Sequence, residues 1–164
     1  MDQVVWVDDN DNILGNVSRI DAHQKGLWHR VSVIYLYNDQ GEILVQHRAD
    51  GRLDHSSAGH VDPGESYLQA AKRELEEELG VKNITLEEVG KDRSESVKRN
   101  GDINRHQYTI YKCKANPIEL NKEEVKAVYW EKPENILKDI QKDPEHIKYT
   151  KGFNVTIKLY LKNL

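Results

Sequence analysis

Residues 59–81 read GHVDPGESYLQAAKRELEEELGV and combine a turn-rich loop with a strongly amphipathic segment. No Gly or Pro interrupts residues 66–79, and good helix formers (Ala, Leu, Glu, Lys and Arg) dominate them. Gly80 stands where a left-handed C-terminal cap is expected. Apolar residues at steps of three and four predict a buried stripe, formed by Leu68, Ala71, Leu75 and Leu79. The pattern predicts a helix over residues 66–79 that packs through one face.

Three carboxylates of this helix crowd a second face. At about 100° per residue, Glu74 and Glu78 lie roughly 40° apart, and Glu77 lies about 60° to the other side of Glu74. Like charges at this spacing weaken a helix, and a bound divalent cation would reverse that cost. Ligands that offer only oxygen suit Mg²⁺ or Mn²⁺. A solvated acidic face is the commoner fate of such a run, so the run alone does not establish a metal site.

The loop before the helix favours the metal site. Gly59, Pro63, Gly64 and Glu65 stand at fixed offsets from the three carboxylates. A loop that enters a helix N-terminus presents free backbone N–H groups to an anion. Phosphate oxygens bridged by Mg²⁺ to carboxylates are the usual apparatus for attack on a phosphorus–oxygen bond. Together, the loop and the helix predict a site for a diphosphate.

The same segment resembles the Nudix box, Gly-x5-Glu-x7-Arg-Glu-U-x-Glu-Glu-x-Gly-U, in which U is aliphatic, and every specified position is present. A chance match in a chain of this length has a probability of ~10⁻⁸, so coincidence is excluded. This resemblance to Nudix hydrolases implies an α/β protein with the Nudix fold, a mixed β-sheet sandwiched between helices (α/β/α). We expect a single domain over residues 1–164.

The resemblance also implies roles for individual residues. Glu74, Glu77 and Glu78 would be metal ligands, with Glu74 or Glu78 closest to the attacking water. Arg73 and Glu65 would hold one another across the loop and the helix. One more ligand or base would come from a downstream segment, and the sequence leaves its three candidates open: Glu95, Glu123 and Glu124.

The implied reaction is Mg²⁺-dependent hydrolysis of a diphosphate linkage in a nucleoside diphosphate derivative or a related organic pyrophosphate. The carbonyl of Gly59 would be a further ligand, and Arg48 and His60 are candidate phosphate contacts. A small diphosphate molecule is therefore the expected partner, and a homodimer is expected because dimers are common among Nudix proteins.

A narrower resemblance, to isopentenyl diphosphate isomerase, covers roughly residues 3–131. In that enzyme a cysteine precedes the glycine–histidine pair, and here Ala58 takes its place; His106 stands where a catalytic glutamate would be. Because alanine cannot transfer a proton, the isomerase mechanism lacks its residues. His29 and His60 occupy positions similar to two metal-binding histidines of the isomerase. A third alternative, a non-catalytic nucleotide-binding Nudix module, has no need of three clustered carboxylates.

Length, charge and composition restrict the kind of protein that this sequence can encode. A chain of 164 residues can bury the core of one domain, and a net charge of −4 argues against a nucleic acid polymer as partner. Cys113 is the only cysteine, which excludes an internal disulfide. No apolar run approaches the roughly 18 residues of a membrane span, and the N-terminus does not resemble a signal peptide. We therefore expect a cytoplasmic protein without a membrane partner.

Outside the box helix, alternating apolar residues predict strands and turns. A hairpin is expected around the turn at 8–12 and another around the turn at 38–41, with a short helix over 133–140. The last segment fits either a strand or a helix, and the resemblance favours a helix. Further strands are expected near 84–89, 107–113 and 125–130. Residues 49–57 and 92–104 are expected to be polar loops, and His23 a solvated side chain.

Overall fold

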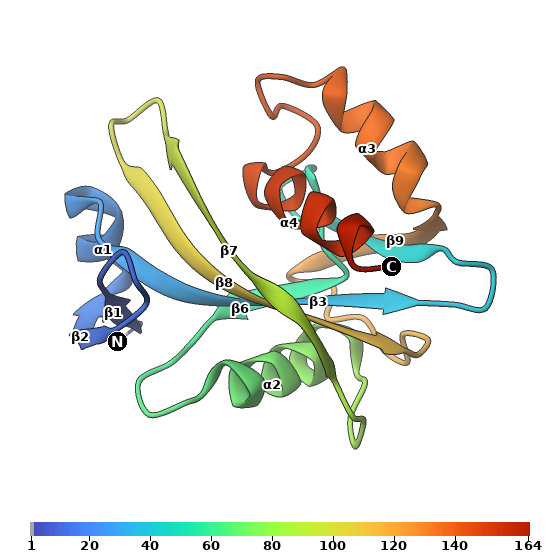
Figure 1. Cartoon of the computed structure of the whole chain (residues 1–164), viewed down its shortest axis with the longest axis horizontal. Helices are drawn as coiled ribbons and strands as arrows, with labels where there is room; N and C mark the ends of the chain where they lie inside the picture. The colour runs from blue at the N-terminus through green and yellow to red at the C-terminus, as the bar shows by residue number, and fades with distance from the viewer. Residues whose placement is uncertain (1) are drawn as a thin grey trace.

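A computed structural model describes residues 2–164. They form a nine-stranded mixed sheet and four helices (Figure 1). The strands are β1 (Gln3–Val7), β2 (Ile13–Ser18), β3 (Trp28–Tyr37), β4 (Ile43–Arg48), β5 (Leu53–Asp54), β6 (Ser57–His60), β7 (Glu87–Val97), β8 (Ile103–Lys114) and β9 (Val125–Glu131). The helices are α1 (Arg19–Lys25), α2 (Tyr67–Leu79), α3 (Pro133–Gln141) and α4 (Lys151–Lys162).

Strand β3 is the centre of the sheet. It runs parallel to β8 along its whole length, with Trp28 opposite Arg105. On its other edge it is antiparallel to β6, with Val31 opposite His60. Strand β4 continues the sheet toward β9, and β1 with β2 forms a hairpin at the opposite end. Segments far apart in the sequence therefore meet around β3.

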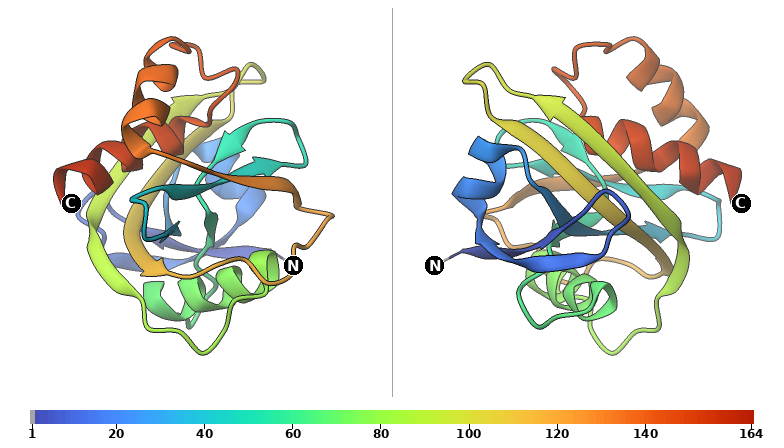
Figure 2. Two further views of the ribbon diagram at one scale, coloured as in Figure 1. Left: turned by 90° about the vertical axis from the view of Figure 1, so that its right-hand side faces the viewer. Right: turned by 60° about the vertical axis from the view of Figure 1, so that its left-hand side comes forward.

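Alternation along β3 divides the core into two layers. Ile34 and Leu36 join the apolar cluster under α2, whereas Val33 and Tyr35 join the cluster under α3 and α4. Figure 1 and Figure 2 show α2 on one face of the sheet and the C-terminal helices on the other. Because both faces of β3 are covered, its residues 33–36 are fully buried. This arrangement confirms the predicted sandwich.

Helix α2 begins and ends close to the predicted residues. The Ser66 hydroxyl accepts from the Gln69 N–H at 3.1 Å, and the Gln69 side chain accepts from the Ser66 N–H at 2.9 Å, which completes a capping box. Gly80 has φ 69° and caps the C-terminus. Three members of the predicted stripe are buried, but Leu68 is 39% exposed and Tyr67 is buried in its place. The buried face of α2 is therefore rotated slightly, from Leu68 toward Tyr67.

The segment 92–104 is a strand pair, so the predicted loop is wrong. Strand β7 starts at Glu87, later than the predicted 84, and continues to Val97; β8 then starts at Ile103. Both strands are long and paired in antiparallel register from Glu87↔Lys112 to Val97↔Ile103. Because one edge of β8 is hydrogen-bonded to β3, its other edge offers an ordered row of backbone groups for pairing. Residues 87–97 pair with this edge as a strand although their side chains are mostly polar.

Helix α1 was not predicted. Its seven residues follow Ser18, whose side chain accepts from the Asp21 N–H at 3.0 Å, and they end at Gly26 with φ 64°. Both predicted hairpin turns, the helix near 133–140 and the C-terminal helix are confirmed. Thr150 caps α4 through the Phe153 N–H at 3.2 Å. Within residues 2–164, none of the helices is long and apolar enough to cross a membrane.

We predict that Ser66→Ala lowers the free energy of unfolding by about 1 kcal/mol, because the capping hydroxyl is lost from α2. Urea denaturation followed by circular dichroism measures this change. Lys72→Ala, an exposed mid-helix substitution, is the control and should change stability by less than about 0.5 kcal/mol. Equal effects of the two substitutions would contradict the importance of the capping box.

Candidate active site

Three carboxylates gather at the sheet-facing side of α2. Glu74, Glu78 and Glu124 each offer an oxygen, and these oxygens lie within 4.8 Å of one another. The first two are one turn apart on α2, and the third precedes β9. The Ala49 N–H donates to the Glu124 carbonyl at 3.0 Å, which ties that backbone to the end of β4. The sheet thus brings a distant acid beside the helix.

Glu78 is buried, with 7% of its surface exposed. Its Oε1 accepts from the Ser57 hydroxyl at 2.5 Å and from the Ala58 N–H at 3.0 Å, so β6 orients the carboxylate. Burial raises the pKa of Glu78 to about 8; these hydrogen bonds oppose the rise, and repulsion from nearby carboxylates adds to it. A carboxyl group poised near neutral pH can accept a proton.

Glu74 lies against the backbone of β6. Burial raises its pKa to about 7, against the opposing effect of Arg73. A Cβ atom added at Gly59 would lie 2.1 Å from the Glu74 Cδ atom. Since no side chain fits there, the glycine is required by the close approach of helix and strand. Gly59 thus makes room for the carboxylate.

Arg73 connects the loop, the strand and the helix. Its Nε and Nη2 donate to the two oxygens of Glu65 at 2.8 and 2.9 Å, which is a bidentate pair. Its Nη2 also donates to the His60 carbonyl at 3.1 Å, and its Nη1 to Glu74 Oε1 at 2.7 Å. Arg73 and Glu65 therefore lie beside the carboxylate group and position it.

Glu77 lies outside this group. Its side chain is 52% exposed and pairs with Arg73 at 3.4 Å. Of the three downstream candidates, Glu124 lies beside the α2 acids. Glu95 lies on β7 and pairs with Arg105 of β8 at 3.2 Å. Helical spacing could not separate Glu77 from Glu74, because the difference depends on which side of α2 meets β6.

A pocket of about 660 Å³ opens above the carboxylates. The predicted contacts Arg48, Gly59 and His60 line it together with Glu74, Glu78 and Glu124. Arg48 pairs with Asp50 at 3.0 Å and with Asp54 at 3.3 Å, so part of its charge is already balanced. Three further cations that sequence reasoning missed also line the pocket: Arg19, Arg52 and Lys151.

The prediction that His23 is solvated is wrong. Its ring lies 5.3 Å from that of His29, centroid to centroid, and His60 and His106 complete the same group. The error follows from the unpredicted helix α1, which carries His23 to the end of β3. No short-range spacing links these four histidines, so only the register of the sheet brings them together.

The family model of the NUDIX domain matches residues 27–153 of this chain. A Nudix hydrolase of Yersinia pestis, itself uncharacterised, is 34% identical over 137 residues, which cover 79% of this chain and 72% of that protein. Another uncharacterised Nudix hydrolase, from Pseudomonas aeruginosa, is 32% identical and covers 86% of this chain and 85% of its own length.

The isopentenyl-diphosphate Delta-isomerase of Serratia proteamaculans is 40% identical, but only over 85 residues, or 48% of each chain. Among solved structures, DR0079 from Deinococcus radiodurans has a TM-score of 0.73 and 22% identity and covers 99% of both chains. The dihydroneopterin triphosphate pyrophosphohydrolase of Escherichia coli has a TM-score of 0.62 and 17% identity, with 82% and 96% coverage. Family match, relatives and fold agree that the chain belongs to the Nudix family of hydrolases.

Proposed function

We propose that this protein hydrolyses a diphosphate linkage in a nucleoside diphosphate derivative or a related small organic pyrophosphate, with Mg²⁺ or Mn²⁺ as its metal. One observation carries the proposal: Glu74, Glu78 and Glu124 converge within 4.8 Å in a pocket that cations also line. Acids at this separation repel one another although Arg73 pairs with Glu74, and a divalent cation bound by all three would remove that cost.

The donors fit a hard cation, because all of them are carboxylate oxygens. Such an ion would supply charge neutralisation at the diphosphate and would activate water. Glu78 or Glu74, through an oxygen that the ion leaves free, would accept the proton of the attacking water, while Arg73 holds Glu74 in place at 2.7 Å. Glu77, exposed on the outer side, would join the site only through a change of rotamer.

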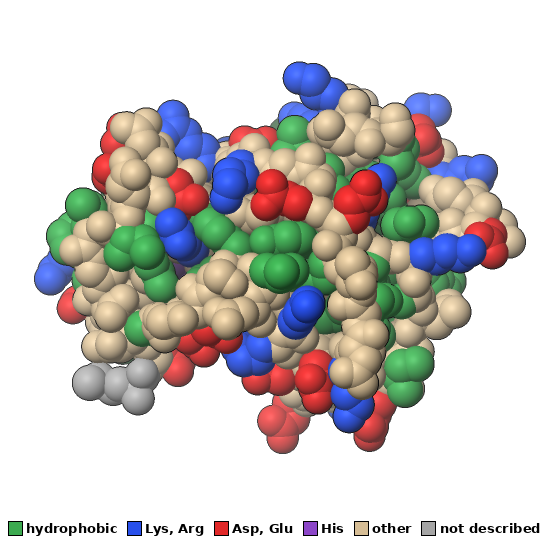
Figure 3. Space-filling view, turned by 60° about the horizontal axis from the view of Figure 1, so that its bottom comes forward, with side chains coloured by type: hydrophobic (Ala, Val, Ile, Leu, Met, Phe, Trp, Pro, Cys, Tyr) green, Lys and Arg blue, Asp and Glu red, His purple; other side chains and the backbone are tan. Residues whose placement is uncertain are grey.

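The proposed substrate class rests on the rest of the pocket. Arg48, His60 and the Gly59 backbone stand beside the carboxylates, and Arg19, Arg52 and Lys151 add positive charge suited to phosphate oxygens. Solved structures of similar fold are named as an Ap4A hydrolase of C. elegans and a dihydroneopterin triphosphate pyrophosphohydrolase, and both names fit this class. Figure 3 shows acidic and basic side chains interspersed on one face, a distribution that favours a small ligand over a polyanion.

Isomerisation of isopentenyl diphosphate is less well supported. The relative named as an isomerase matches 48% of this chain. At the position for which the resemblance implies a cysteine, Ala58 offers only its backbone N–H, and that group donates to Glu78 at 3.0 Å. No acid or base stands there, so a protonation step at carbon lacks its donor.

The proposal is tested by phosphate release from a panel of nucleoside diphosphate derivatives, with and without Mg²⁺. We expect Glu78→Gln to lower kcat/KM on the best substrate by at least about 100-fold, because the amide is a poor metal ligand and cannot act as a base. Glu76→Gln is the matched control, since Glu76 lies on the same helix but is exposed and pairs with Lys82 at 3.9 Å, away from the carboxylate group.

Undiminished turnover by Glu78→Gln would contradict the proposed role. Absence of Mg²⁺-dependent hydrolysis across the whole panel, by folded wild-type protein, would reject the function itself. Conversion of isopentenyl diphosphate to its allylic isomer in a parallel assay would instead support the isomerase.

We predict that Gly59→Ala lowers activity by about 10-fold or more, because the new methyl group occupies the space of the Glu74 carboxylate and displaces it. Gly15→Ala is the control, since its added Cβ would meet the nearest Trp6 atom at an ordinary 3.7 Å. Steady-state kinetics at saturating Mg²⁺ measures both variants. A fully active Gly59→Ala protein would show that the position of Glu74 is not critical.

Metal-free protein should become less stable between pH 7 and about pH 9. The pKa values of Glu74 and Glu78 rise to about 7 and about 8 in the folded state, above the ordinary 4.5, so the folded state binds more protons than the unfolded state. Stability therefore falls as pH rises through these values. Burial lowers the pKa values of His29, His60 and His106, so these groups make stability rise with pH. They do so only below their ordinary pKa of 6.5.

The thermal midpoint measured in EDTA tests this sign. Glu78→Gln should flatten the decline above pH 7, because its amide does not titrate, and Mg²⁺ should restore more stability at pH 9 than at pH 7. A midpoint that is constant or rises over this range in metal-free wild-type protein would refute the assignment.

A further inference from the structure

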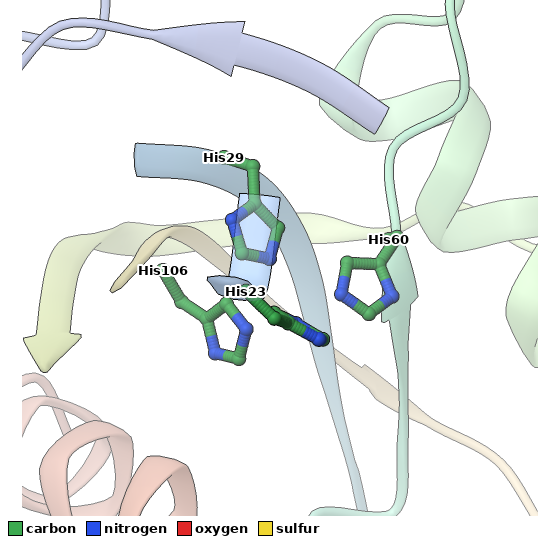
Figure 4. A group of neighbouring side chains, drawn as sticks. All are labelled: His23, His29, His60 and His106. Carbon is green, nitrogen blue, oxygen red and sulfur yellow. The ribbon is translucent and has the colours of Figure 1, made fainter. Parts of the chain in front are cut away.

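Four histidines from four different elements meet at one end of β3. His23 lies on α1, His29 on β3, His60 on β6 and His106 on β8 (Figure 4). In the parallel register, His29 stands opposite His106, and the antiparallel register places His60 opposite Val31 on the neighbouring side. One ring nitrogen from each histidine lies within 4.8 Å of the others.

Among residues 2–164, the nitrogens that face the centre of this group have no hydrogen-bond partner. The Nε2 atoms of His23, His29, His60 and His106 are shielded from solvent and make no hydrogen bond. A buried polar atom without a partner is costly, so native proteins rarely leave one unsatisfied. Four such atoms directed at one point (Figure 4) indicate a ligand that accepts lone pairs from all of them.

The second ring nitrogens show which atoms carry protons. The Nδ1 of His29 lies 2.9 Å from the Leu27 carbonyl, which can only accept, so Nδ1 is protonated and Nε2 carries a lone pair. His106 Nδ1 lies 3.2 Å from the Tyr108 hydroxyl. Metal-bound histidines typically hold their second nitrogen in this way, by donation to a carbonyl or another oxygen.

The charge state of the rings is consistent with this arrangement. Burial lowers the pKa of His29 to about 4, and burial likewise lowers the pKa values of His60 and His106 well below the ordinary range. The pKa of His23 is lowered by burial and by the nearby Lys98 and Arg19. At neutral pH the rings are uncharged, which is the form that binds a metal.

We propose that His23, His29, His60 and His106 form a second metal site, specific for a transition-metal dication such as Zn²⁺ and separate from the carboxylate group on α2. Four imidazole ligands suit zinc, and a site with four protein ligands is closed and structural. Zn–N distances of about 2.0–2.1 Å require nitrogens about 3.4 Å apart, so the rings would draw closer than the present limit of 4.8 Å when the ion binds. Mg²⁺, which prefers oxygen, would not compete.

Two of the four donors, His29 and His60, occupy positions similar to metal-binding histidines of the isomerase, and His23 and His106 complete the group. His106 stands where the isomerase resemblance implies a glutamate, so all four donors here are nitrogens. The site would join α1 to the sheet, and α1 begins at Arg19, which lines the substrate pocket. His60 also adjoins Gly59, against which Glu74 packs. A bound ion would therefore hold in place two parts of the pocket wall.

The test uses the full chain, stripped of metal and then loaded with Zn²⁺ or Co²⁺. After dialysis against buffer containing excess Mg²⁺, we expect about one zinc per chain by elemental analysis. Co²⁺ should give the intense visible absorption of four-coordinate geometry. His106→Asn should weaken Zn²⁺ affinity by at least about 100-fold, whereas His146→Asn, which removes a histidine outside the group, should have no effect.

Two further variants keep the result unambiguous. His23→Ala, on the peripheral helix α1, replaces His106→Asn if circular dichroism shows that the latter does not fold. Glu78→Gln should retain the cobalt spectrum, because it changes only the carboxylate group. No stoichiometric zinc in wild-type protein, equal binding by His106→Asn and His146→Asn, or loss of the spectrum only in Glu78→Gln would each overturn the proposal.

Discussion

The close approach of α2 to β6 is the constraint on which the rest of the site depends. At Gly59 the helix comes so near the strand that the Glu74 side chain occupies the place of a Cβ atom. One turn later, Glu78 accepts hydrogen bonds from Ser57 and Ala58 of the same strand. Two acids are thereby held between the helix and the strand, largely shielded from solvent. Their raised pKa values follow from that burial.

Arg73 offsets part of the negative charge that α2 brings against β6. It is the cation nearest to Glu74, and its bidentate pair with Glu65 fixes the loop that enters α2. The same guanidinium donates to the carbonyl of His60, so one side chain sets the spacing of loop, strand and helix. A residue that does not touch the reacting atoms can therefore control the geometry of those that do.

Strand β6 connects two groups of different chemistry. Gly59 faces the carboxylates of α2, while its neighbour His60 faces three other histidines. The oxygen donors and the imidazole donors thus approach two neighbouring residues of the same strand, and each set suits a different kind of metal ion. Under the two proposals, each ion would therefore bind to its own set of donors.

The sequence alone determined what depends on neighbours within a few residues. It predicted α2 with its C-terminal cap, the acids on that helix, the first two hairpin turns and, with the family resemblance, the C-terminal helix and the layered fold. Only the tertiary structure decided that Glu124 joins Glu74 while Glu77 faces outward, that β7 is a strand, and that His23 meets His106. The physical reason is the separation of the contacting residues along the chain. A helix is specified by contacts three and four residues apart. These groupings depend instead on the sheet register around β3, which pairs residues far apart in the sequence.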